Sequence, residues 1–145
     1  MRFTTVIALT SITLATTANA ETDYSAMIAQ TGLAATEASL SALPDQTPSD
    51  MFALGGVRFL SAVEGALQTL YATQINREMA EMSDLPFLRL PLSPNSNAVP
   101  FQPEVIANTF AAALDDLEGS LAALDTVTDA DDVGVTINTA DLWFD

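Results

Sequence analysis

The sequence predicts a mainly all-α protein: a small antiparallel bundle of three main helices, with a proline-rich extended strap and a short, partly extended acidic tail. Apolar residues recur at helical spacing in three separate segments. Five of the seven prolines lie between residues 86 and 103, where they exclude helix over most of the stretch. A length of 145 residues with 49% hydrophobic residues is that of one ordinary domain with a buried core.

The first twenty residues have the pattern of a secretory signal. Arg2 supplies a positive start, a short apolar run follows from Val6 to Leu14, and Ala18-Asn19-Ala20 forms a cleavage site. The apolar run is too short to span a bilayer. We therefore expect a signal peptide at 1–20 and a single helical domain at 21–145, in a bacterial periplasmic or secreted protein without a stable membrane anchor.

The first helix is predicted over Thr22 to Leu43. Its apolar positions recur helically, although Gly32 interrupts the pattern. Pro44 ends the segment, and only Asp45 to Thr47 separate it from the next one. A connection this short favours an antiparallel helix hairpin.

The central and longest helix is predicted from Thr47 to about Ala80. Thr47 suits the N-cap, Pro48 the first helical position, and Asp50 the place of the capping-box acid. Arg58 and Glu64 fall on the polar side of its wide apolar stripe. The glycine pair 55–56 allows two interpretations, close packing of another helix or a hinge, and the neighbouring small residues favour close packing.

The proline-rich strap follows, and its first half is too apolar for a free linker. The favoured interpretation is a packed connection across the helices, because apolar segments of small domains usually join the core. The alternative is a docking strip in which Phe87 and Arg89 bind a partner, with Arg89 as an anion contact.

The third helix is predicted to open at Pro103, with Glu104 in its first turn, and to run to about Asp125. Its pattern is the cleanest amphipathic repeat after the central helix, and we expect the two helices to pack against each other through their apolar stripes. The acidic residues of this helix are expected on its outer, solvated side. The repeating apolar positions are Val105 or Ile106, Phe110, Ala113 or Leu114, Leu117, Leu121 and Leu124.

The tail is acidic, and residues 133–138 alternate like a short strand. Within it, Asp129, Asp131 and Gly134 match positions one, three and six of an EF-hand calcium loop, whereas Val133 and Ala140 stand where two ligands are required. A polar turn is the favoured interpretation, and a calcium site that includes Asp129, Asp131 and Asp132 is the alternative. A terminal aromatic-Asp pair adds the hypothesis that the natural chain continues and that Asp145 begins a further calcium loop.

Composition restricts the chemistry. The chain has no cysteine and no histidine, which excludes thiol catalysis, a Ser-His-Asp triad and cysteine-ligated zinc within it. A net charge of −15 repels the phosphates of nucleic acids. We therefore predict an exported, non-catalytic helical module, without a cofactor, that binds or scaffolds a protein partner. The alternatives are a calcium-assisted binding domain using the acidic tail, and a small hydrolase using carboxylates such as Glu37 and Glu64.

Overall fold

A computed structural model describes residues 22–73 and 92–143 of the chain. This part is mostly helical, with three α-helices, α1 (Tyr24–Ser41), α2 (Pro48–Thr73) and α4 (Pro103–Leu124), and a short 3₁₀ helix, η2 (Thr139–Asp141). The predicted helices at all three places are therefore confirmed. The predicted signal peptide, the end of the central helix beyond Thr73, Phe87 and Arg89 of the strap, and Asp145 lie outside the described residues.

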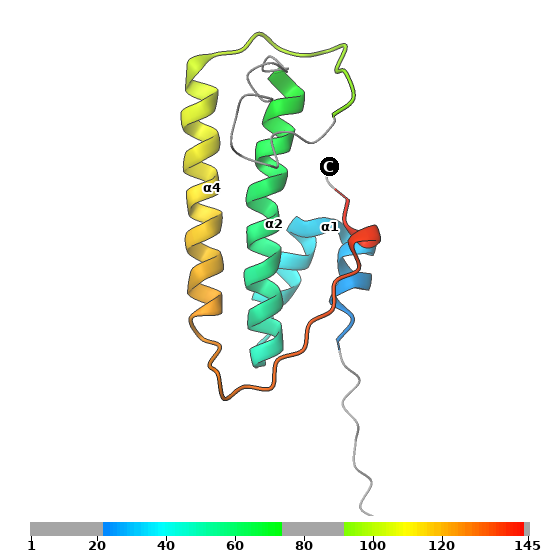
Figure 1. Cartoon of the computed structure of the whole chain (residues 1–145), viewed down its shortest axis with the longest axis vertical. Helices are drawn as coiled ribbons and strands as arrows, with labels where there is room; N and C mark the ends of the chain where they lie inside the picture. The colour runs from blue at the N-terminus through cyan, green and yellow to red at the C-terminus, as the bar shows by residue number, and fades with distance from the viewer. Residues whose placement is uncertain (1–21, 74–91, 144–145) are drawn as a thin grey trace, which may run out of the picture.

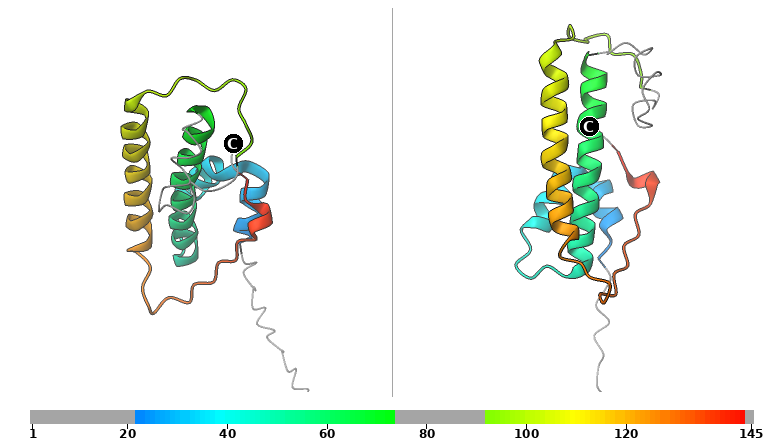
Figure 2. Two further views of the ribbon diagram at one scale, coloured as in Figure 1. Left: turned by 45° about the horizontal axis from the view of Figure 1, so that its top comes forward. Right: turned by 60° about the vertical axis from the view of Figure 1, so that its left-hand side comes forward.

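Helix α2 lies between the other two helices (Figure 1). Helix α4 runs beside it in the opposite direction, as the turned views in Figure 2 also show, and in Figure 1 helix α1 lies along the other side of its lower half. From the end of α4 the tail passes below α2 and rises along α1, where η2 forms. The tail thus begins at the outer helix α4 and ends beside the outer helix α1.

The start of α2 follows the predicted capping box. The Thr47 hydroxyl accepts a hydrogen bond from the Asp50 backbone N–H (3.2 Å), and the Asp50 carboxylate accepts from the Thr47 backbone N–H (2.9 Å). The same carboxylate also accepts hydrogen bonds from the Thr47 hydroxyl (2.6 Å) and from the Tyr24 hydroxyl of α1 (3.0 Å). The cap therefore joins the first turns of α1 and α2.

Helix α1 is kinked at Gly32, which has φ 77° and ψ 177°. This left-handed φ suits glycine, which has no Cβ. The indole of Trp143 packs where a Cβ would lie, at 3.2 Å, and its Nε1–H donates to the backbone carbonyls of Ile28 (3.1 Å) and Ala29 (3.2 Å). The kink thus exposes carbonyl groups that the tail then satisfies.

Helices α2 and α4 meet through small and polar residues. A Cβ at Gly55 would lie 2.7 Å from Leu124, and the Ser120 hydroxyl donates to the Gly55 carbonyl (2.7 Å). Further along, the hydroxyls of Thr69 and Thr109 are hydrogen-bonded at 3.0 Å. Close packing at Gly55 is therefore confirmed.

The prediction that α4 packs against α2 is confirmed, but most of the large residues of its apolar stripe remain exposed. Small residues bring the two backbones so close that the large side chains are displaced to the flank of the contact, where they stay exposed. These side chains are Ile106, Phe110, Leu114, Leu117 and Leu121.

The buried core lies between α1 and the N-terminal half of α2, and Ala123 of α4 joins it. Val135, Ile137 and Leu142 of the tail pack against this core, so the alternating pattern of residues 133–138 marks an extended segment with one inward side. The predicted strand is not formed, since the described residues contain no β-strand. The core residues are Tyr24, Ile28, Leu33, Leu40, Ala53, Leu54, Val57 and Ala123.

Candidate functional site

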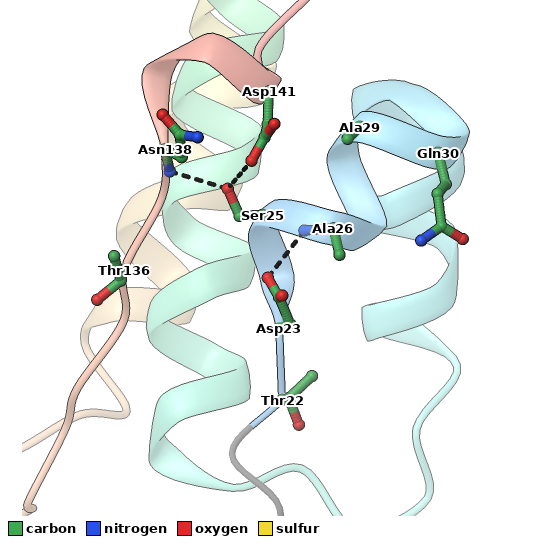
Figure 3. Close-up of a pocket in the computed structure, with 9 residues that line it drawn as sticks. All are labelled: Thr22, Asp23, Ser25, Ala26, Ala29, Gln30, Thr136, Asn138 and Asp141. Atoms are coloured by element: carbon green, nitrogen blue, oxygen red, sulfur yellow. Dashed lines mark hydrogen bonds between the residues drawn. The ribbon is translucent and has the colours of Figure 1, made fainter.

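A polar cleft of about 620 Å³ lies between the N-terminal turns of α1 and the tail (Figure 3). At its centre the Ser25 hydroxyl donates to the Asp141 carboxylate (2.8 Å) and accepts from the Asn138 backbone N–H (2.8 Å). On the other side, the Asp23 carboxylate caps α1 by accepting from the Ala26 N–H (2.9 Å). The remaining lining residues are Thr22, Ala29, Gln30 and Thr136.

The polar groups of this cleft hold the tail in place. Ser25 is only 7% exposed, and its hydroxyl is used as donor and acceptor between two segments of the chain. No histidine stands beside Ser25 to accept its proton, because the chain has none. The contacts of Ser25 and Asp141 hold the tail against α1, and Asp23 caps α1; none of the three was singled out by the sequence.

Asp50 and Tyr24 form a hydrogen-bonded pair in which the pKa values of both groups are shifted. Burial, followed by the hydrogen bond to Asp50, raises the pKa of Tyr24 to about 12. Burial alone would raise the pKa of Asp50, but the hydrogen bonds from Thr47 and Tyr24 outweigh it and lower that pKa below its usual value. The shifts follow from the capping network at the start of α2, so they serve stability.

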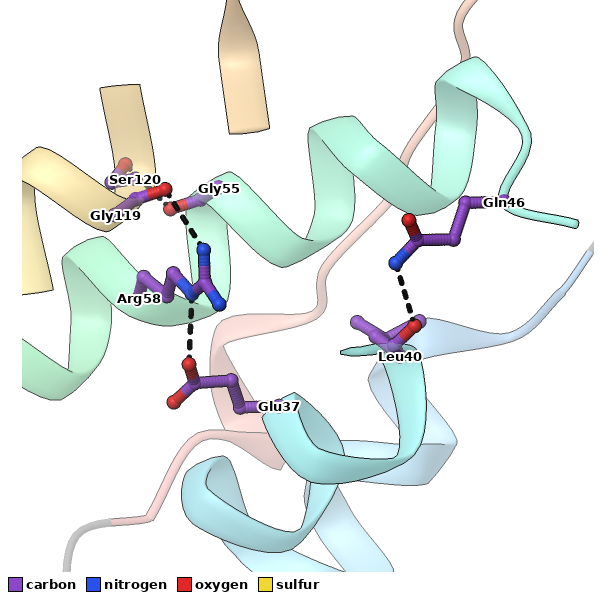
Figure 4. Close-up of polar contacts among 7 residues, drawn as sticks. All are labelled: Glu37, Leu40, Gln46, Gly55, Arg58, Gly119 and Ser120. Carbon is purple, nitrogen blue, oxygen red and sulfur yellow. Dashed lines mark hydrogen bonds and ion pairs between the residues drawn. The ribbon is translucent and has the colours of Figure 1, made fainter. Parts of the chain in front are cut away.

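Arg58 links all three helices (Figure 4). Its Nε donates to the Glu37 carboxylate of α1 at 2.8 Å, and its Nη1 donates to the Gly119 carbonyl of α4 at 3.0 Å. Burial, followed by the nearby charges of Glu37 and Asp115, raises the pKa of Asp116 on the same side of α4. Arg58 is therefore a polar bridge between the helices, and Glu37, a hydrolase candidate, is its ion-pair partner.

The predicted metal-binding aspartates follow α4 in a turn. Asp129 and Asp132 are exposed, and the Asp131 carboxylate accepts hydrogen bonds from the Thr128 backbone N–H (2.7 Å) and hydroxyl (2.8 Å). These bonds lower the pKa of Asp131. Within residues 22–73 and 92–143, no group of three or more His, Cys, Asp or Glu side chains is arranged to hold a metal ion. Calcium binding by Asp129, Asp131 and Asp132 stays a prediction.

One surface of α2 and α4 carries large, exposed apolar side chains. We call it the α2–α4 face, and Phe110 (64% exposed), Leu121 (61%) and Leu114 (54%) are its most exposed members. In two antiparallel helices, the residue after each contact residue turns toward the same side of the pair. Phe59 follows Arg58, Phe110 follows Thr109, and Leu121 follows Ser120, so these side chains share one side. The full set is Phe52, Phe59, Ile106, Phe110, Leu114, Leu117 and Leu121.

Gly56 also belongs to the α2–α4 face. It lies one turn after Phe52 and nearly one turn before Phe59, on the same stripe of α2. A Cβ built at Gly56 meets no described atom within 4 Å, in contrast to Gly55. Close packing, which was predicted for the glycine pair as a whole, therefore explains Gly55 and leaves Gly56 as a notch in an exposed apolar surface.

Comparison of the chain with family models, with curated proteins and with solved structures finds no match. None of the described helices combines the length and the apolar character needed to cross a bilayer.

Proposed function

We propose that the protein is an exported, non-catalytic helical module that binds a protein partner through its helix surfaces. In this proposal the mature domain is secreted or periplasmic and forms the antiparallel three-helix bundle with a packed proline-rich strap. The α2–α4 face is the binding surface, and its exposure is the single observation that carries the proposal.

The size of the face supports this proposal. Seven large apolar side chains are each between 38% and 64% exposed on two adjacent helices. They form a patch comparable with the largest apolar patch on a typical monomer, which is about 300–600 Å² and often functional. Exposed apolar area of this extent is unfavourable in water unless a partner covers it.

The surface chemistry points the same way. On α4 the large apolar residues form one stripe, from Ile106 to Leu121, without a charged residue inside it. The contacts between α2 and α4 are made by other residues, among them Gly55, Ser120 and Thr109, so the stripe is not required for the packing of these two helices. Interfaces are enriched in such aromatic and apolar cores from which charge is absent.

Site-specific photo-crosslinking tests the proposal. A benzophenone amino acid is placed at Phe110 on the face, and in a control chain at Val99, which is 55% exposed but sits in the loop before α4. In the cells that make the protein, we expect light to join the Phe110 variant to another polypeptide and the Val99 variant to give no such adduct. The proposal is refuted by equal adduct patterns from both positions, because the face would then contact nothing specifically.

A further inference from the structure

The α2–α4 face combines an apolar stripe, an acidic edge and a notch. Glu118 lies one helical turn from Leu114 and nearly one turn from Leu121, and Asp125 lies one turn after Leu121. Glu118 and Asp125 are both exposed. The face is therefore bordered along α4 by carboxylates.

Among the described residues, no basic side chain balances this edge. Arg58 is the only basic residue among residues 22–73 and 92–143, and its guanidinium is bonded to Glu37 and to the Gly119 carbonyl on the other flank of the α2–α4 contact. The whole chain carries a net charge of −15. A second copy of the chain would thus bring acidic edges together, whereas a basic partner would be attracted and oriented by them.

Gly56 adds a steric feature. Glycine inside a helix is less favourable than alanine, and a Cβ built at Gly56 would have no described side chain or neighbouring element within 4 Å. The notch lies on the apolar stripe of α2 between Phe52 and Phe59. A bulky apolar side chain of a partner can enter there and reach the α2 backbone.

We infer that the α2–α4 face binds a cationic amphipathic helix, whose apolar side covers the exposed stripe with a large side chain in the Gly56 notch and whose Lys or Arg residues meet Glu118 and Asp125. A helix is the element that fits, because an amphipathic helix presents an apolar stripe beside charged residues, which is the complement of this face. This inference rests on the proposed function and names the chemistry of the partner.

The test uses two fluorescein-labelled 18-residue helical peptides with the same leucine stripe. One carries lysine and the other glutamate at all polar positions. Binding to the natural mature protein is followed by fluorescence anisotropy at several salt concentrations. We expect the lysine peptide to bind at least about tenfold more tightly than the glutamate peptide and to weaken as salt increases.

Three variants separate apolar docking from simple charge attraction. We expect Phe110→Ala and Gly56→Leu each to weaken the lysine peptide by about tenfold or more, since one removes an exposed anchor and the other fills the notch. Val99→Ala, an exposed apolar residue outside the face, is expected to change the affinity less than about twofold. Circular dichroism checks that each variant is folded, and Leu121→Ala is the second anchor variant should Phe110→Ala be unfolded.

Three results would overturn the inference. The first is equal binding of the lysine peptide to the natural protein, Phe110→Ala and Gly56→Leu, which means attraction by charge alone. The second is equal affinity for the two peptides. The third is a dimer in sedimentation equilibrium that Phe110→Ala dissociates, which makes a second copy the occupant. If the photo-crosslinking experiment gives a specific adduct from Phe110, any of these three results overturns only the cationic helix as the partner. If it gives no such adduct, the proposed function itself is refuted.

Discussion

The two adjacent glycines of α2 should respond in opposite directions to the same substitution. In Gly55→Ala the new Cβ would lie 2.7 Å from Leu124 Cγ and 3.2 Å from the Ser120 backbone carbonyl, so α2 and α4 must separate or Leu124 must move. In Gly56→Ala the new Cβ meets no described atom within 4 Å. Both substitutions gain the same helix propensity, which favours alanine by about 1 kcal/mol.

The difference between the two variants therefore isolates the packing term. Overpacking by one methyl group costs about 1–3 kcal/mol, and the Ser120 hydrogen bond to the Gly55 carbonyl is strained by the same movement. We expect Gly56→Ala to raise the free energy of unfolding by about 1 kcal/mol. We expect Gly55→Ala to be about 2 kcal/mol less stable than Gly56→Ala.

Urea unfolding followed by circular dichroism at 222 nm measures both variants against the natural protein. The slopes of the transitions must agree for the comparison to report stability alone. In thermal melts, the two variants should differ by about 8 °C, at roughly 4 °C per kcal/mol for a chain of this size. A Gly55→Ala protein as stable as Gly56→Ala would refute the close contact between α2 and α4.

Three further outcomes follow from the contacts. Trp143→Phe keeps a ring over the kink of α1 but loses the indole N–H, so the free energy of unfolding in urea should fall by about 1 kcal/mol. An unchanged midpoint would mean that the tail does not cap the kink. Arg58→Met should lower the free energy of unfolding by about 1 kcal/mol, and by less in 1 M NaCl, because salt screens the partly exposed ion pair between Arg58 and Glu37. A loss of stability that does not depend on salt would indicate that Arg58 acts through packing alone. Because the pKa of Asp50 is lower in the folded protein, its carboxylate contributes to the free energy of unfolding above the ordinary carboxyl pKa of about 4, and this contribution is lost as the pH falls further. Asp50→Asn should therefore flatten the loss of stability in acid, and an equally steep loss would contradict the hydrogen-bond network around Asp50.

Local sequence signals determined the helices and their starts. Thr47, Pro48 and Asp50 specify the beginning of α2 through hydrogen bonds between residues three positions apart, and Pro103 specifies the beginning of α4. Such features depend on neighbours in the sequence, so the sequence alone reveals them.

The tertiary structure decided which sides of the helices meet. Periodicity identifies the apolar stripe of α4 but does not distinguish a packed stripe from an exposed one, since both give the same pattern. Here Gly55, Ser120, Thr69 and Thr109 allow a closer approach than large side chains do, and that approach turns Phe110 and its neighbours outward. Likewise, the roles of Ser25, Asp141 and Arg58 depend on residues 20 to more than 100 positions away. The candidate binding surface therefore follows from packing between distant segments, which no local pattern in the sequence encodes.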